Sequence, residues 1–277
     1  MNNTLYEKQA KLKELLLSYG NLAVAFSGGV DSTFLLQTAH DVLGDRALAV
    51  TAAPVFVPPR ELQEAKDFCR SRSIRQIVIP AEALNIDSVR HNPPDRCYHC
   101  KHEIFGNILR VAGENGISFV AEGSNTDDVG DYRPGMRAIR ELGVKSPLLE
   151  AGLSKEDIRA LSREMGLPTW DKPSFACLAS RFVYGERITD ERLSMVDRAE
   201  QLLMDLGFRQ FRVRIHGDLA RIELLPEDLE KLIRQDMRER VYRALKEYGF
   251  SYVTLDLAGY RTGSMNETIL RNTAEQA

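Results

Sequence analysis

The sequence predicts an α/β protein in which a doubly wound parallel sheet is joined to a smaller C-terminal α+β domain. Three observations support this fold class. Segments that are apolar along their whole length alternate with helical patterns from residue 22 to about residue 165, as in parallel strands covered on both faces. Beyond about residue 180, strand patterns close together in the chain and flanked by helices replace this alternation. The chain has 277 residues, 43% of them hydrophobic, so each of two domains could bury a core.

The elements of the first domain follow in a regular order. A helix is predicted over residues 5–18, with Leu12, Leu15 and Leu16 on one face. The predicted parallel strands cover residues 22–26, 47–53, 74–80 and 117–123. The helices that follow them are predicted over residues 31–43, 59–72, 101–115 and 154–165. Such sheets bind ligands beyond the carboxyl ends of their strands, so the loops after the strands are the expected site.

The second domain is predicted to hold a small sheet between two helices. The helices are predicted over residues 190–206 and 226–247. The strands are predicted over residues 211–216, 219–224 and 252–257, and the first two are expected to pair antiparallel across His216-Gly217-Asp218. The predicted domains are residues 1–180 and residues 181–277.

Composition and charge favour some classes of protein over others. Lys and Arg number 37 against 40 Asp and Glu, a net charge of -3, which argues against a wide nucleic-acid surface. The N-terminal stretch is polar and charged, and no apolar run approaches the roughly 18 residues of a membrane span. We therefore expect a soluble, cytoplasmic protein that binds neither membrane nor nucleic acid.

The stretch Ser27-Gly28-Gly29-Val30-Asp31-Ser32 joins the first predicted strand to its helix. Two glycines allow a sharp turn that brings backbone N–H groups close to a phosphate, and the helix adds its free N–H groups and positive end. Ser27 and Ser32 can donate hydroxyl hydrogen bonds. Asp31 would repel a bare phosphate, so we expect it to act through Mg²⁺ or to orient loop amides. The alternative is a simple strand-to-helix turn capped by Asp or Ser.

This hexapeptide resembles the PP-loop of the ATP pyrophosphatase superfamily, and the segment 147–174 also resembles that superfamily. The resemblance implies an adenine nucleotide alpha-hydrolase-like fold, with the β- and γ-phosphates of ATP held on residues 27–32. Enzymes of this superfamily activate a carboxyl or carbonyl oxygen by adenylation and release pyrophosphate. Ammonia or sulfur then displaces AMP.

Polar residues after the fourth predicted strand are further candidates for the site. We expect only a few of them to contact ligand, because acids in loops are often merely solvated. These candidates are Asn125, Asp127, Asp128, Asp131, Arg133 and Arg137.

Four cysteines in such a chain indicate metal binding or catalysis more than disulfides. Cys69 falls in a helical pattern and is expected in the core. Cys97 and Cys100 form a Cys-x-x-Cys pair, and Cys177 is a distant third thiol. For these three, four interpretations remain open: a structural zinc site with His99 as fourth ligand, a redox disulfide, unrelated thiols of which Cys177 alone is reactive, and a [4Fe–4S] cluster. Three thiolates would leave one iron of such a cluster open for an extra sulfide.

Arginines of the second domain suit an anion. Arg212 and Arg214 are two residues apart on a predicted strand, so they share one face. Two guanidinium groups on one face suit a phosphate. Arg221 and Glu223 have the same spacing on the next strand. The alternative is a solvated face with cross-strand ion pairs.

The whole chain resembles the LarE family of ATP-dependent sulfur transferases, which act in the synthesis of the nickel-pincer cofactor of lactate racemase. The resemblance covers roughly residues 5–270. It rests on the residues Ser27–Ser32, Asp131–Gly135, Cys177, Ser180–Phe182, Tyr184–Gly185, Arg212–Arg214, Ala220–Leu224 and Tyr252–Leu257.

The resemblance implies that the substrate is pyridinium-3,5-biscarboxylic acid mononucleotide. ATP would adenylate one of its carboxylates, and sulfur would then replace AMP. In some relatives a single cysteine gives up its sulfur and becomes dehydroalanine. Others carry three cysteines and a [4Fe–4S] cluster. This sequence has the three-cysteine pattern of Cys97, Cys100 and Cys177, so a cluster is expected, and a sacrificial Cys177 is the alternative.

The resemblance also implies roles for further residues. Those expected to take part in catalysis are Cys177, Asp31, Ser180, Arg181 and Glu200. Arg212 and Arg214 are expected to bind substrate, and Glu200 and Glu223 are candidates for Mg²⁺. The family suggests trimers paired into hexamers and a supply of sulfide. Rival functions are a tRNA thiolase, an ammonia-dependent amide synthetase and a non-catalytic nucleotide binder.

Overall fold

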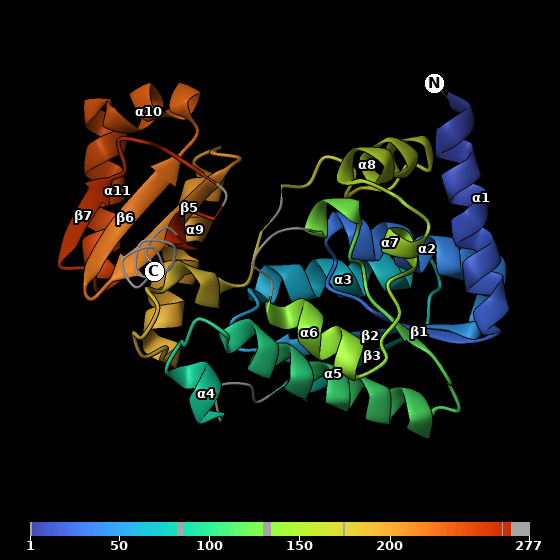
Figure 1. Cartoon of the computed structure of the whole chain (residues 1–277). Coiled ribbons are helices and arrows are strands. Elements are labelled where there is room, and N and C mark those ends of the chain that lie inside the picture. The colour runs from blue at the N-terminus through green and yellow to red at the C-terminus, as the bar shows by residue number, and fades with distance from the viewer. Residues whose placement is uncertain (1, 82–85, 130–133, 174, 262, 267–277) are drawn as a thin grey trace, which may run out of the picture. The chain divides into compact units, whose positions relative to one another are not determined.

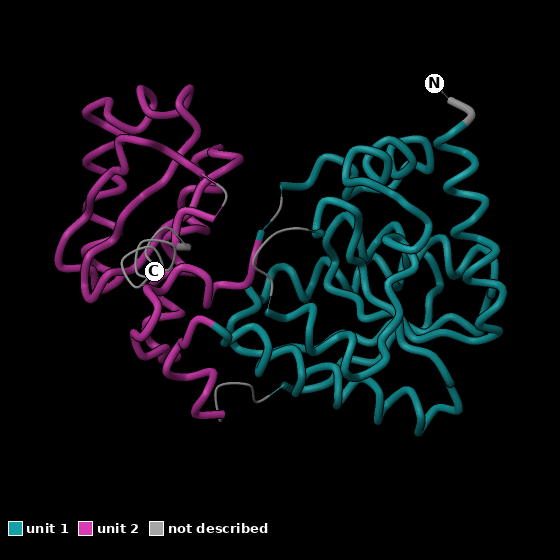
Figure 2. Tube along the Cα trace, in the orientation of Figure 1, with its two compact units in different colours: residues 1–83, 95–175 teal, residues 84–94, 176–277 magenta. Residues whose placement is uncertain are grey.

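The computed structural model describes residues 2–81, 86–129, 134–173, 175–261 and 263–266 (Figure 1). The chain divides into two compact units (Figure 2). Unit 1 comprises residues 1–83 and 95–175, and unit 2 comprises residues 84–94 and 176–277. The segment 84–94 belongs to unit 2 through backbone hydrogen bonds, from Gly185 N–H to Asn92 O at 2.9 Å and from Ile188 N–H to Arg90 O at 2.8 Å.

Unit 1 is built on a parallel sheet, as the sequence predicts. Its strands are β1 (Leu22–Ala25), β2 (Ala47–Pro54), β3 (Gln76–Ala81) and β4 (Val120–Ala121), in the order β3-β2-β1-β4. The order reverses at β1, because β2 lies on one side of it and β4 on the other. The loops after β1 and β4 therefore flank the switch point where such folds bind ligands.

In unit 1, β1 ends one residue before its predicted end, at Ala25, and β3 and β4 differ more from the predicted ranges. β3 begins at residue 76 and not 74, because the Ile74 N–H still bonds to Cys69 O at the end of the preceding helix. β4 covers two residues of the predicted 117–123. The Ile117 N–H bonds to Ala112 O, and beyond Ala121 the Glu122 N–H bonds to Lys145 O.

Helices cover both faces of this sheet (Figure 1). On one face, α1 (Asn2–Tyr19), α2 (Val30–Leu43), α3 (Pro59–Ser71) and α8 (Lys155–Glu164) share a core with alternate strand residues such as Val24 and Ala49. On the other, α5 (Arg96–Glu114) and α6 (Pro134–Glu141) pack against Ala23, Leu48 and Val50. A short helix, α7 (Pro147–Glu150), precedes α8. Strands buried on both faces explain the continuous apolar runs.

Unit 2 contains a three-stranded mixed sheet, β5-β6-β7. The strands β5 (Phe211–His216) and β6 (Leu219–Leu224) are antiparallel, as predicted, and β7 (Tyr252–Leu255) runs parallel to β6. The helices are α4 (Asp87–Arg90), α9 (Asp190–Asp205), α10 (Pro226–Ile233) and α11 (Gln235–Glu247). The prediction of one helix over 226–247 is wrong, because Arg234 has extended dihedral angles (φ -56°, ψ 140°) and separates two helices.

Across the parts of the chain described above, we find no helix with the length and apolar character that a membrane crossing requires.

Replacing Gly28 by Ala should lower the free energy of unfolding by about 2 kcal/mol. An L-residue in the left-handed backbone conformation costs about 1–2 kcal/mol, and the added Cβ would also crowd α3. Gly28 has φ +72°, and an added Cβ would lie 3.3 Å from the Ala65 Cβ. Urea denaturation followed by the fluorescence of Trp170, the single tryptophan, measures this in unit 1.

Gly152→Ala is the matched control. Gly152 has φ +78°, but no atom of the described residues lies within 4 Å of its added Cβ. This variant should lose about 1 kcal/mol from backbone strain alone. Equal losses in the two variants would contradict a tight contact between the loop and α3.

Candidate active site

The serine and glycine loop after β1 is closed by its own hydroxyl groups. The Ser27 and Ser32 Oγ atoms are 3.1 Å apart, and the Ser32 hydroxyl donates to Gly29 O at 3.2 Å. The same Ser32 Oγ accepts from the Ser27 N–H at 3.3 Å. Gly29 is the N-cap of α2, and no described side chain caps that helix, so the alternative of a side-chain-capped turn is not supported. Uncapped N–H groups at a helix start can bind an anion.

Asp31 lies in the first turn of α2 and faces two side chains from other elements. The Lys155 ammonium forms an ion pair with its carboxylate, and the Asn125 side-chain amide donates to Oδ1 at 3.3 Å. The loop after β4 comes very close here, because a Cβ at Gly123 would lie 3.1 Å from both the Asp31 Cβ and the Ser32 N. The two loops therefore meet at the switch point.

The other polar candidates after β4 have mostly structural contacts. The Asp127 carboxylate accepts from the Lys155 N–H at 3.0 Å, and that of Asp128 accepts from the Asn125 N–H at 3.0 Å. The Arg137 guanidinium stacks over the Tyr98 ring at 3.7 Å. Asp131 and Arg133 lie outside the described residues.

Sequence reasoning did not single out two lysines that reach the loop. Lys155 pairs with Asp31, and Lys172 donates to Gly28 O at 3.2 Å and to the Glu64 carboxylate at 2.6 Å. Both lie in the segment 147–174. In this segment Ser154 and Asp157 exchange hydrogen bonds as a capping box, which marks the start of α8. This sequence pattern could have placed Lys155 in the first turn of a helix.

The thiols are distributed over both units. Cys97 and Cys100 lie in the first turns of α5 in unit 1, where a spacing of three residues makes them neighbours on the helix surface. The Arg96 guanidinium donates to the Cys97 Sγ at 3.6 Å. Cys177 precedes the 3₁₀ turn Leu178–Arg181 of unit 2, and Ser180 N–H bonds to its carbonyl at 2.9 Å.

Two further observations bear on metal binding by these residues. His99, the fourth ligand considered for zinc, has its Nε2 3.1 Å from the Asp95 carboxylate. Within neither unit do three or more described His, Cys, Asp or Glu side chains gather as a metal site. Cys97 and Cys100 belong to unit 1, and Cys177 belongs to unit 2. Binding of one metal cluster by these three thiols stays a prediction.

Cys69 is a core residue, as the sequence predicts. Its side chain is buried in the same cluster as Phe68, and burial raises the pKa of its thiol to about 12. A thiol held in its neutral form is a poor nucleophile and metal ligand. Cys69 is therefore separate from the chemistry of the other three cysteines.

Arg181 of unit 2 is buried and tied to the segment that carries Cys177. Its guanidinium donates twice to Glu200 of α9, with both distances 2.8 Å, and also to Ala176 O at 2.7 Å and Ser180 Oγ at 2.8 Å. Burial alone would raise the pKa of Glu200, but the Arg181 charge and hydrogen bonds hold that pKa below its usual range. Arg181 and Glu200 thus fix the backbone beside Cys177.

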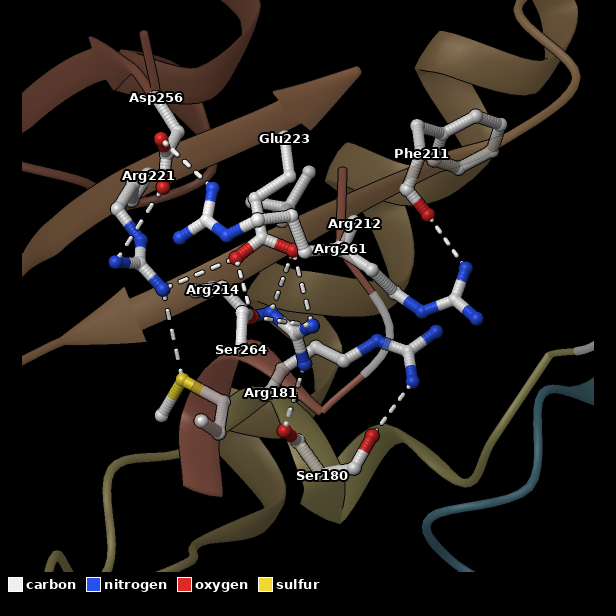
Figure 3. Close-up of polar contacts among 12 residues, drawn as sticks. Ser180, Arg181, Phe211, Arg212, Arg214, Arg221, Glu223, Asp256, Arg261 and Ser264 are labelled. Carbon is white, nitrogen blue, oxygen red and sulfur yellow. Dashed lines mark hydrogen bonds and ion pairs between the residues drawn. The ribbon is translucent and has the colours of Figure 1, made fainter. Parts of the chain in front are cut away.

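A second buried network connects β5 with β6 (Figure 3). The Arg214 guanidinium donates to one Glu223 oxygen at 2.9 and 3.1 Å and to Ser180 O at 3.0 Å. The other Glu223 oxygen accepts from Arg221 at 3.0 Å and from Ser264 at 2.8 Å. The carboxylates of Glu200 and Glu223 are thus partners of arginines, and Mg²⁺ binding by them stays an untested prediction.

Arg212 is buried beside two other arginines. Its guanidinium donates to Phe211 O at 2.6 Å and stacks over the Tyr260 ring at 5.1 Å. Burial, and then the nearby Arg181 charge, lower its pKa to about 10. The alternative of a solvated face is wrong, because Arg212 and Arg214 are each at most 5% exposed, although the cross-strand ion pair that this alternative included is present. An anion would relieve this concentration of positive charge.

Comparison with known proteins gives relatives along most of the chain. An uncharacterized protein of Synechocystis is 41% identical over 95% of this chain and 99% of its own length. The pyridinium-3,5-bisthiocarboxylic acid mononucleotide synthase of Lactiplantibacillus plantarum is 38% identical over 97% of both chains. A component of the glutamine-hydrolyzing GMP synthase of Thermoplasma acidophilum is 27% identical over 74% of this chain and 70% of its own.

No model of a protein family matches the chain. The similarity to the Lactiplantibacillus synthase nevertheless extends through both units, and the loop of Ser27–Ser32 lies where a PP-loop acts, at the switch point of a parallel sheet. The chain belongs to the LarE-like family of PP-loop ATP pyrophosphatases, and it is a homologue of an ATP-dependent, sulfur-inserting enzyme.

Proposed function

We propose that this protein adenylates a carboxylate of pyridinium-3,5-biscarboxylic acid mononucleotide with ATP and converts it to a thiocarboxylate. The proposal is supported above all by the 38% identity over 97% of both chains to the Lactiplantibacillus synthase, whose name states the bisthiocarboxylic product. The uncapped start of α2 beside a loop of serines and glycines supports the use of ATP.

The first half-reaction uses groups of unit 1. A carboxylate oxygen of the substrate attacks the α-phosphorus of ATP, and the bond to pyrophosphate breaks. Charge grows on the leaving pyrophosphate, where the N–H groups at the start of α2 and the Ser27 and Ser32 hydroxyls can stabilise it. The oxygen atoms of Asp31, Ser27 and Ser32 are the hard ligands that Mg²⁺ prefers, so these residues fit the ion. Bound there, Mg²⁺ would neutralise phosphate charge.

The second half-reaction replaces AMP by sulfur. A sulfide nucleophile attacks the carbonyl carbon of the acyl adenylate, and AMP leaves with the electron pair of the broken bond. In the form we favour, Cys97, Cys100 and Cys177 would hold a [4Fe–4S] cluster, which would supply the sulfur. The pairing of Cys97 and Cys100 on one helix suits two of its ligands. The alternative is that Cys177 itself gives up its sulfur.

We place the phosphate of the mononucleotide on Arg212 and Arg214 of unit 2. Among the residues that the structure describes, five arginines and three acids lie in or beside the two networks, so positive charge is in excess within that set. Ser180 and Arg181 would act with them by fixing the loop beside Cys177. A trimer or hexamer and an external supply of sulfide complete the proposal.

Arg212→Met should raise KM for the mononucleotide by about tenfold or more, since a hydrogen bond to a charged group contributes about 1.5–3 kcal/mol. The KM for ATP should stay nearly unchanged. Thermal unfolding should shift little or upward, because Met removes a buried charge that lies beside Arg181. Steady-state kinetics and calorimetry measure both effects.

Arg198→Met is the control for this variant, because Arg198 also stacks on a tyrosine ring, that of Tyr248 at 4.8 Å, but on the exposed side of α9. It should leave both KM values unchanged. An unchanged KM for the mononucleotide in Arg212→Met would remove Arg212 from the proposed phosphate site.

Cys97→Ser, Cys100→Ser and Cys177→Ser should each lose most of the iron and acid-labile sulfide that the wild type takes up in anaerobic reconstitution. Cys69→Ala should retain both, because Cys69 is a core residue. Metal analysis together with an electronic spectrum measures this. If the wild type takes up no iron, the cluster is excluded, and dehydroalanine at position 177 after turnover would identify a sacrificial cysteine.

A further inference from the structure

The segment that follows β7 stays beside β6 after the regular strand pairing has ended. The Asp256 N–H bonds to Ile222 O at 2.8 Å, and the Tyr260 N–H bonds to Leu224 O at 2.7 Å. Gly259 has φ +68°, and an added Cβ would lie 2.7 Å from the same Leu224 O. A residue with a side chain would therefore push the segment away from β6, and glycine permits the close approach.

Two side chains of this segment contact the arginines on which we place the substrate phosphate. The Ser264 hydroxyl accepts from the Arg214 guanidinium at 3.1 Å and donates to the Glu223 carboxylate at 2.8 Å (Figure 3). The Tyr260 ring stacks against the Arg212 guanidinium at 5.1 Å. Ser264 is only 6% exposed, so bulk water does not compete for its two hydrogen bonds. One segment thus supplies a partner to each of the two arginines.

The contacts of Arg214 fix the direction of its guanidinium group. Its Nε and one Nη2 N–H donate to Glu223 at 3.1 and 2.9 Å, one Nη1 N–H donates to Ser180 O at 3.0 Å, and the other Nη2 N–H donates to Ser264. A guanidinium is planar and has five N–H groups. Four hydrogen bonds therefore determine where the fifth, on Nη1, points, and Ser264 supplies one of the four.

The same segment also controls how Glu223 divides its charge between two arginines. One Glu223 oxygen binds Arg214, and the other accepts from Arg221 at 3.0 Å and from Ser264. Arg221 is drawn the other way by Asp256, with 3.5 Å between Nη1 and Oδ2. Without the Ser264 hydroxyl, the Glu223 carboxylate could turn towards Arg221 and release Arg214. The hydroxyl therefore keeps Glu223 and Arg214 in one arrangement.

We propose that the segment after β7, residues 256–261 and 263–266, orients the two arginines for the phosphate of the mononucleotide, with Ser264 and Tyr260 as its positioning residues. This inference rests on the proposed function, because it presupposes that phosphate on Arg212 and Arg214. Ser264 acts through Arg214, whose remaining N–H it helps to aim. Tyr260 acts through Arg212, because a stacked ring holds the face of a guanidinium and leaves the N–H groups at its edge for an anion.

Ser264→Ala tests this by titration calorimetry with two probes, the mononucleotide and inorganic phosphate. The affinity for both should fall about fivefold, the effect of one lost hydrogen bond. In steady-state kinetics the KM for the mononucleotide should rise while kcat stays nearly unchanged, because the phosphate is bound equally before and during the reaction. The KM for ATP should not change, since the loop of Ser27–Ser32 keeps its own contacts in unit 1.

Tyr260→Leu removes the ring and should weaken binding of both probes about threefold or more, because a cation–π contact in a desolvated place is lost. Tyr260→Phe keeps the ring and should recover most of the affinity. A difference between these two variants separates stacking on Arg212 from any role of the Tyr260 hydroxyl.

Thr254→Val is the matched control for loss of a hydroxyl. The Thr254 hydroxyl donates to Ala220 O at 3.0 Å, on the strand that leads into the segment, and takes no hydrogen bond from Arg212 or Arg214. This variant also removes one hydroxyl hydrogen bond from the edge of the sheet. Its affinities for the mononucleotide and for phosphate should equal those of the wild type.

A double-mutant cycle shows whether Ser264 acts through Arg214. Once Arg214→Met has removed the guanidinium, the further change Ser264→Ala should alter the affinity for the mononucleotide less than about twofold. If the two changes weaken binding independently, Ser264 does not act by positioning Arg214, and the inference is wrong for that residue.

Other outcomes separate the inference from the proposed function. If Ser264→Ala and Tyr260→Leu lower the unfolding temperature but leave both affinities unchanged, the segment is structural only, and the inference is wrong whatever the protein catalyses. A wild type that binds neither phosphate nor the mononucleotide would also overturn it. A wild type whose affinity for the mononucleotide depends on Ser264, but which transfers no sulfur, leaves the inference standing and refutes the proposed function.

Discussion

The approach of two loops at the switch point of the parallel sheet determines what unit 1 can bind. Gly28 lets the loop after β1 pack on α3, and Gly123 lets the loop after β4 come within van der Waals distance of the start of α2. A side chain at either position would push these segments apart. Because the backbones meet there, Asn125 and Lys155 reach Asp31, and the uncapped N–H groups of α2 lie beside an ion pair.

Unit 2 is organised by buried charge. Replacing buried ion pairs by apolar residues is often neutral or stabilising, so the network of Arg181, Arg214, Glu200 and Glu223 is weak evidence for stability. Its geometry points instead to positioning. Arg181 holds the carbonyl of Ala176, Arg214 holds that of Ser180, and both thereby fix the segment around Cys177. Arg212, beside them, carries positive charge that suits a substrate phosphate.

How much the sequence could predict depended on distance along the chain. The parallel sheet and the loop of Ser27–Ser32 follow from adjacent residues, and the structure confirms the sheet. The partner of Asp31 is 124 residues away, and no local pattern connects the two. The break at Arg234 carries no Gly or Pro to mark it. Arginines are usually solvated, so the burial of Arg212 and Arg214 was unexpected until the fold enclosed them.

The central claim is that the loop holds ATP while a carboxylate oxygen of the substrate takes AMP. The most direct measurement uses substrate whose carboxylate oxygens carry a heavy isotope, in a single turnover with ATP, Mg²⁺ and sulfide, followed by mass spectrometry of AMP and pyrophosphate. Adenylation predicts one heavy oxygen in AMP, carried from the carboxylate when sulfur displaces it, and none in pyrophosphate. Heavy oxygen in inorganic phosphate, or AMP that contains none, would contradict the account.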